Sequence, residues 1–153
     1  MFDPMDEVRY RYRLAINYLR ETNNAFDRGD WRGTVANAQL SAENAAKAVI
    51  AIYRLPSWSH DPSGELEELI DRMPRELTSL ILELANIAKA LAPEHARSTY
   101  GEPSAGLTPW DIYGRDDAER ALAMARRAVD MMNTILKSLG INVTGTNDDS
   151  TQR

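Results

Sequence analysis

The sequence has no cysteine and only two histidines, His60 and His95. Without cysteine the chain can form neither disulfides nor thiolate metal sites. Two histidines are also too few for a histidine-rich metal centre. We therefore expect a protein that holds no metal and no other cofactor.

Long hydrophobic runs are missing as well. No stretch approaches the roughly 18 uninterrupted apolar residues that a membrane-spanning helix needs. The first residues, MFDPMDEVRYRYR, carry acidic and basic side chains where a secretory signal peptide has an apolar segment. We therefore expect a cytoplasmic protein that does not contact membranes.

Positive charge is scarce, and it is unevenly placed. The net charge of −5 at neutral pH disfavours a generally basic nucleic-acid binder. Residues 1–54 have eight Lys or Arg and seven Asp or Glu, whereas residues 61–83 have two and seven. We therefore expect a partner that carries phosphates to avoid the segment that follows His60.

Sequence motifs of the common enzyme classes are also absent. No glycine-rich phosphate loop follows a strand, and neither HExxH nor GxSxG occurs. The chain has no internal repeat and no strand-like alternation of any length. The residues by themselves therefore give no indication of an enzyme.

The sequence does contain helical periodicity in five segments, where apolar residues recur every three or four positions. Gly29 is expected to end the first helix and Asp30 to cap the second, so the turn between them is short. A turn that short makes long helices antiparallel neighbours. The expected helices span residues 6–28, 31–54, 62–73, 75–92 and a last segment that begins at Asp116 and has Lys137 in its final turn.

These helices predict an all-α fold, an antiparallel four-helix up-and-down bundle with an additional short helix. Asp61 is expected to cap the third helix, and Asp116 and Glu119 have the spacing of a capping box at the start of the last. Residues 1–140 are expected to form a single domain, and the polar tail 141–153 to be disordered.

A long connection, residues 92–115, joins the last two expected helices. It holds three prolines and three glycines, and Thr108-Pro109 is expected to start a single helical turn within it. Connections of this length are uncommon in compact domains and are often functional.

The second expected helix combines alanines with an unusual number of polar groups. Its alanines share one face centred on Ala42, where small side chains let a neighbouring helix approach closely. Gln39, Glu43 and Lys47 lie one turn apart on a different face. This polar row is either a solvated surface with a Glu43–Lys47 pair, or a polar seam at a dimer interface or ligand cleft.

Two further groups of residues are open to two interpretations, and for His60 one interpretation is expected. Arg13 lies in the RYRYR segment, which suits either a solvated helix face or contacts with phosphate and bases. The residues from His95 through Arg97 to Tyr100 combine groups that bind phosphate and bases, although a histidine alone is typical of a helix end. His60 is expected to belong to a loop and capping pair with Asp61.

Three segments together resemble the HEPN family, named for higher eukaryotes and prokaryotes nucleotide-binding. Residues 42–48, AENAAKA, resemble the family's A-E-x-A-x-K-A signature. The stretch SHDPSGELEEL resembles the His-Asp segment before the family's short third helix. ARSTYGEPSAG and DDAERALAMARRAV resemble its Arg/Tyr/Pro loop and the helix that follows. The resemblance covers most of residues 6–138.

The resemblance implies a homodimer and a gene partner of the minimal nucleotidyltransferase type, as in toxin–antitoxin systems. Many family members are metal-independent ribonucleases in which a histidine follows an arginine by a few residues. Arg97 is near the position of that arginine, but no histidine occurs after His95. We therefore expect no catalytic residue.

The leading hypothesis is a non-catalytic, dimeric nucleotide- or RNA-binding module that partners a nucleotidyltransferase. Arg97 and Tyr100 would contact phosphate and base. One alternative is a metal-independent ribonuclease toxin, with His95 or a residue across the dimer as general base. A third possibility is a purely structural interaction bundle. The expected ligand-binding residues are Arg97, Tyr100, His95, Glu43, Lys47 and Arg13.

Overall fold

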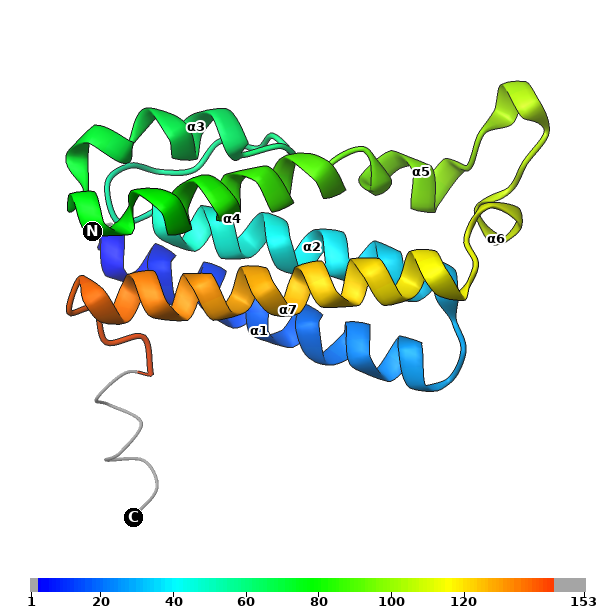
Figure 1. Ribbon diagram of the computed structural model, residues 1–153, viewed down its shortest axis with the longest axis horizontal. Coiled ribbons are helices and arrows are strands. Elements are labelled where there is room, and N and C mark those ends of the chain that lie inside the picture. The colour runs from blue at the N-terminus through cyan, green and yellow to red at the C-terminus, as the bar shows by residue number, and fades with distance from the viewer. Residues whose placement is uncertain (1–2, 145–153) are drawn as a thin grey trace, which may run out of the picture.

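The computed structural model describes residues 3–144, and this part of the chain is helical with no named strand (Figure 1). The α-helices are α1 (Pro4–Asp27), α2 (Trp31–Ile50), α3 (Ser63–Glu68), α4 (Thr78–Leu91), α5 (Glu94–Tyr100), α6 (Pro109–Ile112) and α7 (Arg115–Ser138). Short 3₁₀ turns are η1 (Ile70–Arg72), η2 (Arg75–Leu77) and η3 (Pro103–Ala105). The predicted all-α fold is confirmed.

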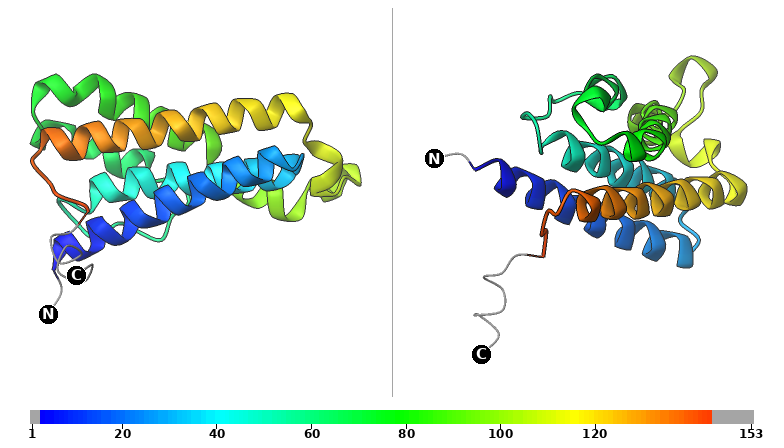
Figure 2. Two further views of the ribbon diagram at one scale, coloured as in Figure 1. Left: turned by 90° about the horizontal axis from the view of Figure 1, so that it is seen from below. Right: turned by 60° about the vertical axis from the view of Figure 1, so that its left-hand side comes forward.

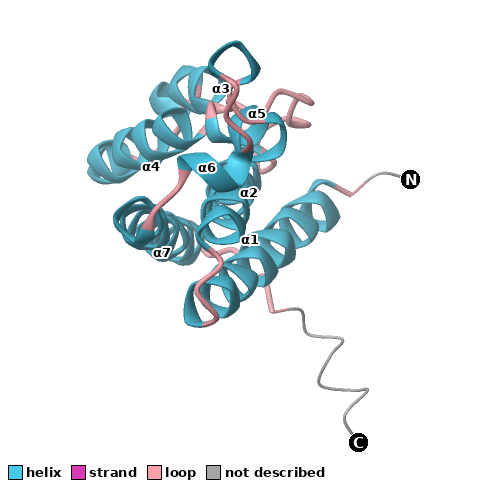
Figure 3. Cartoon of the chain, turned by 90° about the vertical axis from the view of Figure 1, so that its right-hand side faces the viewer, coloured by secondary structure: helices cyan, strands magenta, loops and turns pink. Residues whose placement is uncertain are grey.

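Helix α2 is the centre of the bundle. It contacts each of the other α-helices, and the end-on view shows α1, α7, α4 and the shorter helices arranged around it (Figure 3). Fifteen of its twenty residues are buried. A helix that is buried nearly all round must satisfy its polar side chains inside the protein, because water cannot reach them.

The turn between α1 and α2 forms as the sequence predicts. Gly29 has a positive φ of 76°, which glycine adopts without steric cost. The Asp30 carboxylate accepts a hydrogen bond of 2.8 Å from the Gly33 N–H and so caps α2. The two helices are antiparallel neighbours (Figure 2).

Two expected helices are shorter than predicted. Helix α2 ends at Ile50 rather than Arg54, because the chain tightens there into turns in which the Ile52 and Tyr53 N–H groups bond the carbonyl oxygens three residues earlier. Helix α3 ends at Glu68 and passes into η1, because Met73 is extended before Pro74.

The start of α7 also differs from the prediction. The helix begins at Arg115, and the Asp117 carboxylate accepts a hydrogen bond of 2.9 Å from the Gly114 N–H. A capping box of Asp116 with Glu119 is therefore wrong, because the helix begins one residue earlier than expected. At α3 the Asp61 carboxylate does bond the Ser63 N–H, at 3.0 Å, although Pro62 takes the position next to the helix.

The connection after α4 contains more helix than expected. The turn at Thr108-Pro109 is confirmed as α6, but α5 was not predicted. Only seven residues long, α5 lies between Pro93 and Gly101 and carries too short a periodic pattern to be recognised. Gly101 has a φ of 74°, and a Cβ atom there would overlap the Leu107 carbonyl oxygen, so the chain reversal requires glycine.

The end of the described chain packs against the bundle. Ile141 and Val143 contact the hydrophobic core. The rest of the tail predicted to be disordered, residues 145–153, lies outside the described residues. None of the described helices combines the length and apolar character that crossing a membrane requires.

Candidate functional site

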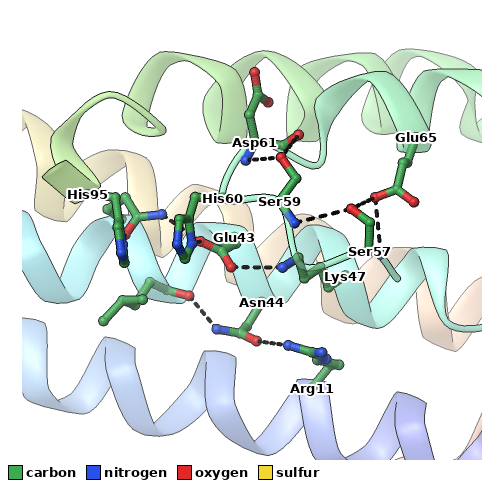
Figure 4. Close-up of polar contacts among 12 residues, drawn as sticks. Arg11, Glu43, Asn44, Lys47, Ser57, Ser59, His60, Asp61, Glu65 and His95 are labelled. Atoms are coloured by element: carbon green, nitrogen blue, oxygen red, sulfur yellow. Dashed lines mark hydrogen bonds and ion pairs between the residues drawn. The ribbon is translucent and has the colours of Figure 1, made fainter. Parts of the chain in front are cut away.

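The polar row of α2 is buried. The exposed fractions of Gln39, Glu43 and Lys47 are 1%, 6% and 2%. The loop of residues 51–62 and the start of α5 lie over this row (Figure 4). This burial excludes the interpretation of the row as a solvated surface.

Hydrogen bonds within the row satisfy its charged and polar atoms. The Lys47 ammonium lies 2.9 Å from Glu43 Oε2, and the Gln39 amide donates a 2.8 Å hydrogen bond to Glu43 Oε1. Burial raises the pKa of Glu43, but the hydrogen bonds from Lys47 and Gln39 and the charge of Lys47 outweigh it and hold this pKa below its ordinary value. Glu43 is therefore an ionised, buried acceptor at neutral pH.

A second set of polar side chains on α2 ties that helix to α1. Ser41 donates a 2.8 Å hydrogen bond to the Ala15 carbonyl oxygen, and Arg11 donates one of 3.2 Å to the Asn44 side chain. These groups bridge two long helices that pack closely. We assign them a structural role, separate from the Gln39–Glu43–Lys47 row.

The two histidines of the chain meet above the polar row. His60 Nδ1 lies 3.1 Å from Glu43 Oε1, and His95 Nδ1 lies 3.0 Å from Gln39 Oε1. Their rings are stacked, with centroids 3.5 Å apart and planes inclined by 19°. The expected pairing of His60 with Asp61 is replaced by this contact, because the loop turns His60 inward toward Glu43 (Figure 4). We call Gln39, Glu43, Lys47, His60 and His95 the histidine centre.

The hydrogen bonds determine which ring nitrogens are free. Glu43 can only accept, so His60 Nδ1 carries the hydrogen of that bond. The Gln39 amide nitrogen donates to Glu43, which leaves its oxygen to accept from His95 Nδ1. In both neutral rings the lone pair is then on Nε2, at the edge away from α2. No hydrogen bond to either Nε2 comes from the described residues.

The two rings differ in their surroundings. Half of the His60 side chain is exposed, at 52%, and it lies against the Glu43 carboxylate. Burial, followed by the nearby positive charge of His60, lowers the pKa of His95, although Glu43 partly opposes this. His95 is therefore neutral at pH 7.

The histidine centre also contains the residue types of a metal site. Glu43, His60 and His95 each offer one ligand atom, and these atoms lie within 4.8 Å of one another. Ligands of one ion must converge on a point. Here the rings are nearly parallel, their Nδ1 atoms are engaged, and the Lys47 ammonium lies on the carboxylate. This geometry does not converge on a single ion held by all three residues.

Arg97 belongs to a neighbouring cluster of compensated charges. Its Nε lies 2.7 Å from Glu102 Oε2 and its Nη1 3.4 Å from Glu94 Oε1. The buried Tyr113 hydroxyl donates to the same Glu94 carboxylate. Because two carboxylates already pair with Arg97, little of its charge is available to a ligand.

The structure brings together some of the expected ligand-binding residues and separates others. Glu43, Lys47 and His95 are in contact within the histidine centre, to which the structure adds His60 and Gln39. Tyr100 is 73% exposed at the end of α5, and Arg13 is exposed on α1. The sequence does contain one indication that His60 belongs to a site, since it is one of only two histidines in the chain.

The fold and the histidine centre together define a small helical-bundle domain whose central helix carries a buried Glu/Lys pair. The sequence matches the HEPN domain family over residues 8–135, and the chain belongs to this family. Membership gives it a nucleotide- or RNA-related role in general.

A solved structure supports the fold. The crystal structure of TT1696 from Thermus thermophilus is similar, with a TM-score of 0.64 and 22% sequence identity. The similarity covers 84% of this chain and 98% of that one, and at this identity it concerns the fold alone. Among curated proteins no match is found.

Proposed function

We propose that this chain is a non-catalytic nucleotide- or RNA-binding module in which His60 and His95 contact a phosphate group. The observation that supports this proposal is the pair of stacked rings whose Nε2 edges are free. Both rings are anchored through Nδ1 to one helix, so their free edges point to the same side. Once both rings are protonated, their two adjacent Nε2–H groups suit two oxygens of a single phosphate.

The proposed contact requires protonation of the rings. An imidazolium donates from both nitrogens, so a ring that keeps its Nδ1 bond can donate from Nε2 to phosphate only after it takes up a proton. We therefore expect phosphate affinity to rise as the pH falls, and because the pKa of His95 is lowered by burial, its contact needs a pH below the ordinary histidine pKa of about 6.5.

Ribonuclease activity is the second possible function, and one contact favours it. The Glu43–His60 hydrogen bond resembles the carboxylate–imidazole pairs that orient a general base. Cleavage of RNA by its own 2′-hydroxyl, however, needs a base and an acid on opposite sides of the phosphorus, because the attacking and leaving oxygens are in line. Two stacked rings approach from one side, so binding is the better supported function.

The assembly and the partner belong to the same proposal, and membership of the HEPN family is what supports them. We propose a cytoplasmic homodimer that pairs with a nucleotidyltransferase in a toxin–antitoxin-like system. Light scattering should give about twice the chain mass of 17.2 kDa. Arg97, Tyr100 and Arg13 are outer groups of the ligand site in this proposal.

Calorimetric titration with inorganic phosphate and with AMP at pH 6 tests the proposal. His60→Gln and His95→Gln should each weaken both ligands about tenfold, the effect of losing one charge-assisted hydrogen bond. Arg97→Ala, at an outer position of the site, should weaken binding less than either histidine variant, because Arg97 is already paired with two carboxylates. Equal affinity in the wild type and both histidine variants would contradict the proposal.

The cleavage alternative needs its own assay. Labelled single-stranded RNA is incubated with the protein in EDTA, beside the His95→Ala variant. We expect no cleavage by either protein. Metal-independent cleavage that disappears in the variant would replace the binding module by a ribonuclease.

A further inference from the structure

We propose that Trp58 is the base-stacking platform of the histidine centre, so that the ligand is a nucleotide unit with its base on Trp58 and its phosphate at His60 and His95. This inference rests on the proposed function. It adds the recognition of a base to the recognition of a phosphate.

The exposure of Trp58 is the first observation. Its side chain is 91% exposed, the highest value among the large hydrophobic residues of the described chain. An indole left in water contributes almost no burial energy to folding. Aromatic faces are what proteins use to stack nucleic-acid bases, and every base offers a suitable face.

The loop that presents Trp58 is held in place by hydrogen bonds on both sides of the indole. Ser57 Oγ donates a 2.8 Å bond to Glu65 of α3, and it accepts one of 3.2 Å from the Ser59 N–H. Ser59 Oγ in turn accepts a 3.1 Å bond from the Asp61 N–H (Figure 4). A platform that is fixed before binding loses less conformational entropy when a ligand binds.

The position of Trp58 relative to the histidines fits one nucleotide. Trp58 and His60 are two residues apart, so their Cα atoms are separated by no more than about 7 Å. The proposal places a base on the indole and a phosphate at the imidazoles, joined by a single sugar. The His60 ring stacks on the His95 ring and hydrogen-bonds the Glu43 carboxylate. The loop that carries Trp58 therefore also carries one residue of the proposed phosphate site.

Charge around the loop limits the size of the ligand. Residues 61–83, which directly follow His60 in the chain, hold seven acidic and two basic residues. Additional phosphates on that side would meet negative charge. We therefore expect one nucleotide unit, either free or at an accessible point of a single strand, rather than a duplex.

The test compares ligands that differ only in the base. Ribose 5-phosphate, AMP and a short oligoadenylate are titrated at pH 6 against the wild type, Trp58→Ala and Trp110→Ala. Trp110 is the matched control because it is 70% exposed but lies on α6 over Arg32. Trp58→Ala should weaken AMP and oligoadenylate about tenfold, leave ribose 5-phosphate unchanged, and leave the melting temperature unchanged. Trp110→Ala should bind all three as the wild type does.

The outcomes separate this inference from the proposed function. If the wild type binds ribose 5-phosphate and AMP equally, or if Trp58→Ala binds AMP as the wild type does, the stacking platform is wrong and the phosphate site stands. If the wild type binds none of the three ligands, the proposed function itself fails. If both AMP and oligoadenylate lose affinity in Trp58→Ala, the platform is supported. The ligand that the wild type binds more tightly then shows whether a free nucleotide or a strand is preferred.

Discussion

The two faces of α2 are both buried, but they are covered in different ways. The alanine face, with Ala38, Ala42 and Ala45 fully buried, packs into the hydrophobic core of the bundle. The polar face lies beneath a loop and the first turn of a short helix, and His60 above it is half exposed. Close packing stabilises the first face, whereas internal pairing of charges allows the second to be buried. One helix thereby provides both the core and the site.

Replacing Lys47, the cation of the polar face, should have the largest effect on stability. Lys47→Met leaves the Glu43 carboxylate buried without its ammonium partner, which should lower the free energy of unfolding by about 3–5 kcal/mol. The double variant Glu43→Gln with Lys47→Met leaves no unpaired charge and should recover much of the loss. Urea unfolding measures both. A single variant as stable as the wild type would mean that the pair does not control the burial of this face.

Enlarging a side chain on the alanine face should have the next largest effect. Ala42 is fully buried, so Ala42→Leu should overpack the core and cost about 1–3 kcal/mol. Ala123→Leu, at an exposed position of α7, is the matched control and should leave the melting temperature nearly unchanged. An unchanged or raised melting temperature for Ala42→Leu would show that this face is not close-packed.

The Arg97 cluster lies beside the polar face but outside it, and its effect should be small. Arg97 is 37% exposed, and exposed ion pairs contribute between about 0 and 1 kcal/mol. Arg97→Ala should therefore change the free energy of unfolding by less than about 1 kcal/mol. A larger loss in thermal unfolding would place Arg97 among the buried, stabilising charges.

The smallest expected effect is the dependence of stability on pH through His95. Because burial and the charge of His60 lower its pKa in the folded state, the unfolded chain takes up a proton first as the pH falls. The contribution of His95 is complete above the unfolded pKa of about 6.5 and is lost as the pH falls through the folded pKa. His95→Gln should remove this part of the pH dependence in urea unfolding. An identical pH profile for the variant would contradict this explanation.

The sequence predicts the fold well because helical periodicity and caps are local. Four long helices and the Gly29-Asp30 turn all follow from residues close together in the chain. It predicts less of the site, because burial of the polar row depends on residues that are distant in sequence. His60 and His95 reach α2 from a loop and from α5, a helix too short to be recognised. Arg97 matches a pattern of the family, yet two nearby carboxylates compensate its charge.

The state of the two imidazoles tests the central claim most directly. Because the chain has only two histidines, a ¹⁵N NMR spectrum of the imidazole nitrogens contains signals from His60 and His95 alone. We predict that both neutral rings carry their hydrogen on Nδ1, and that phosphate added at pH 6 shifts the Nε2 signals of both rings together. Hydrogens on Nε2 in the neutral rings, or Nε2 signals that phosphate leaves unchanged, would contradict the account.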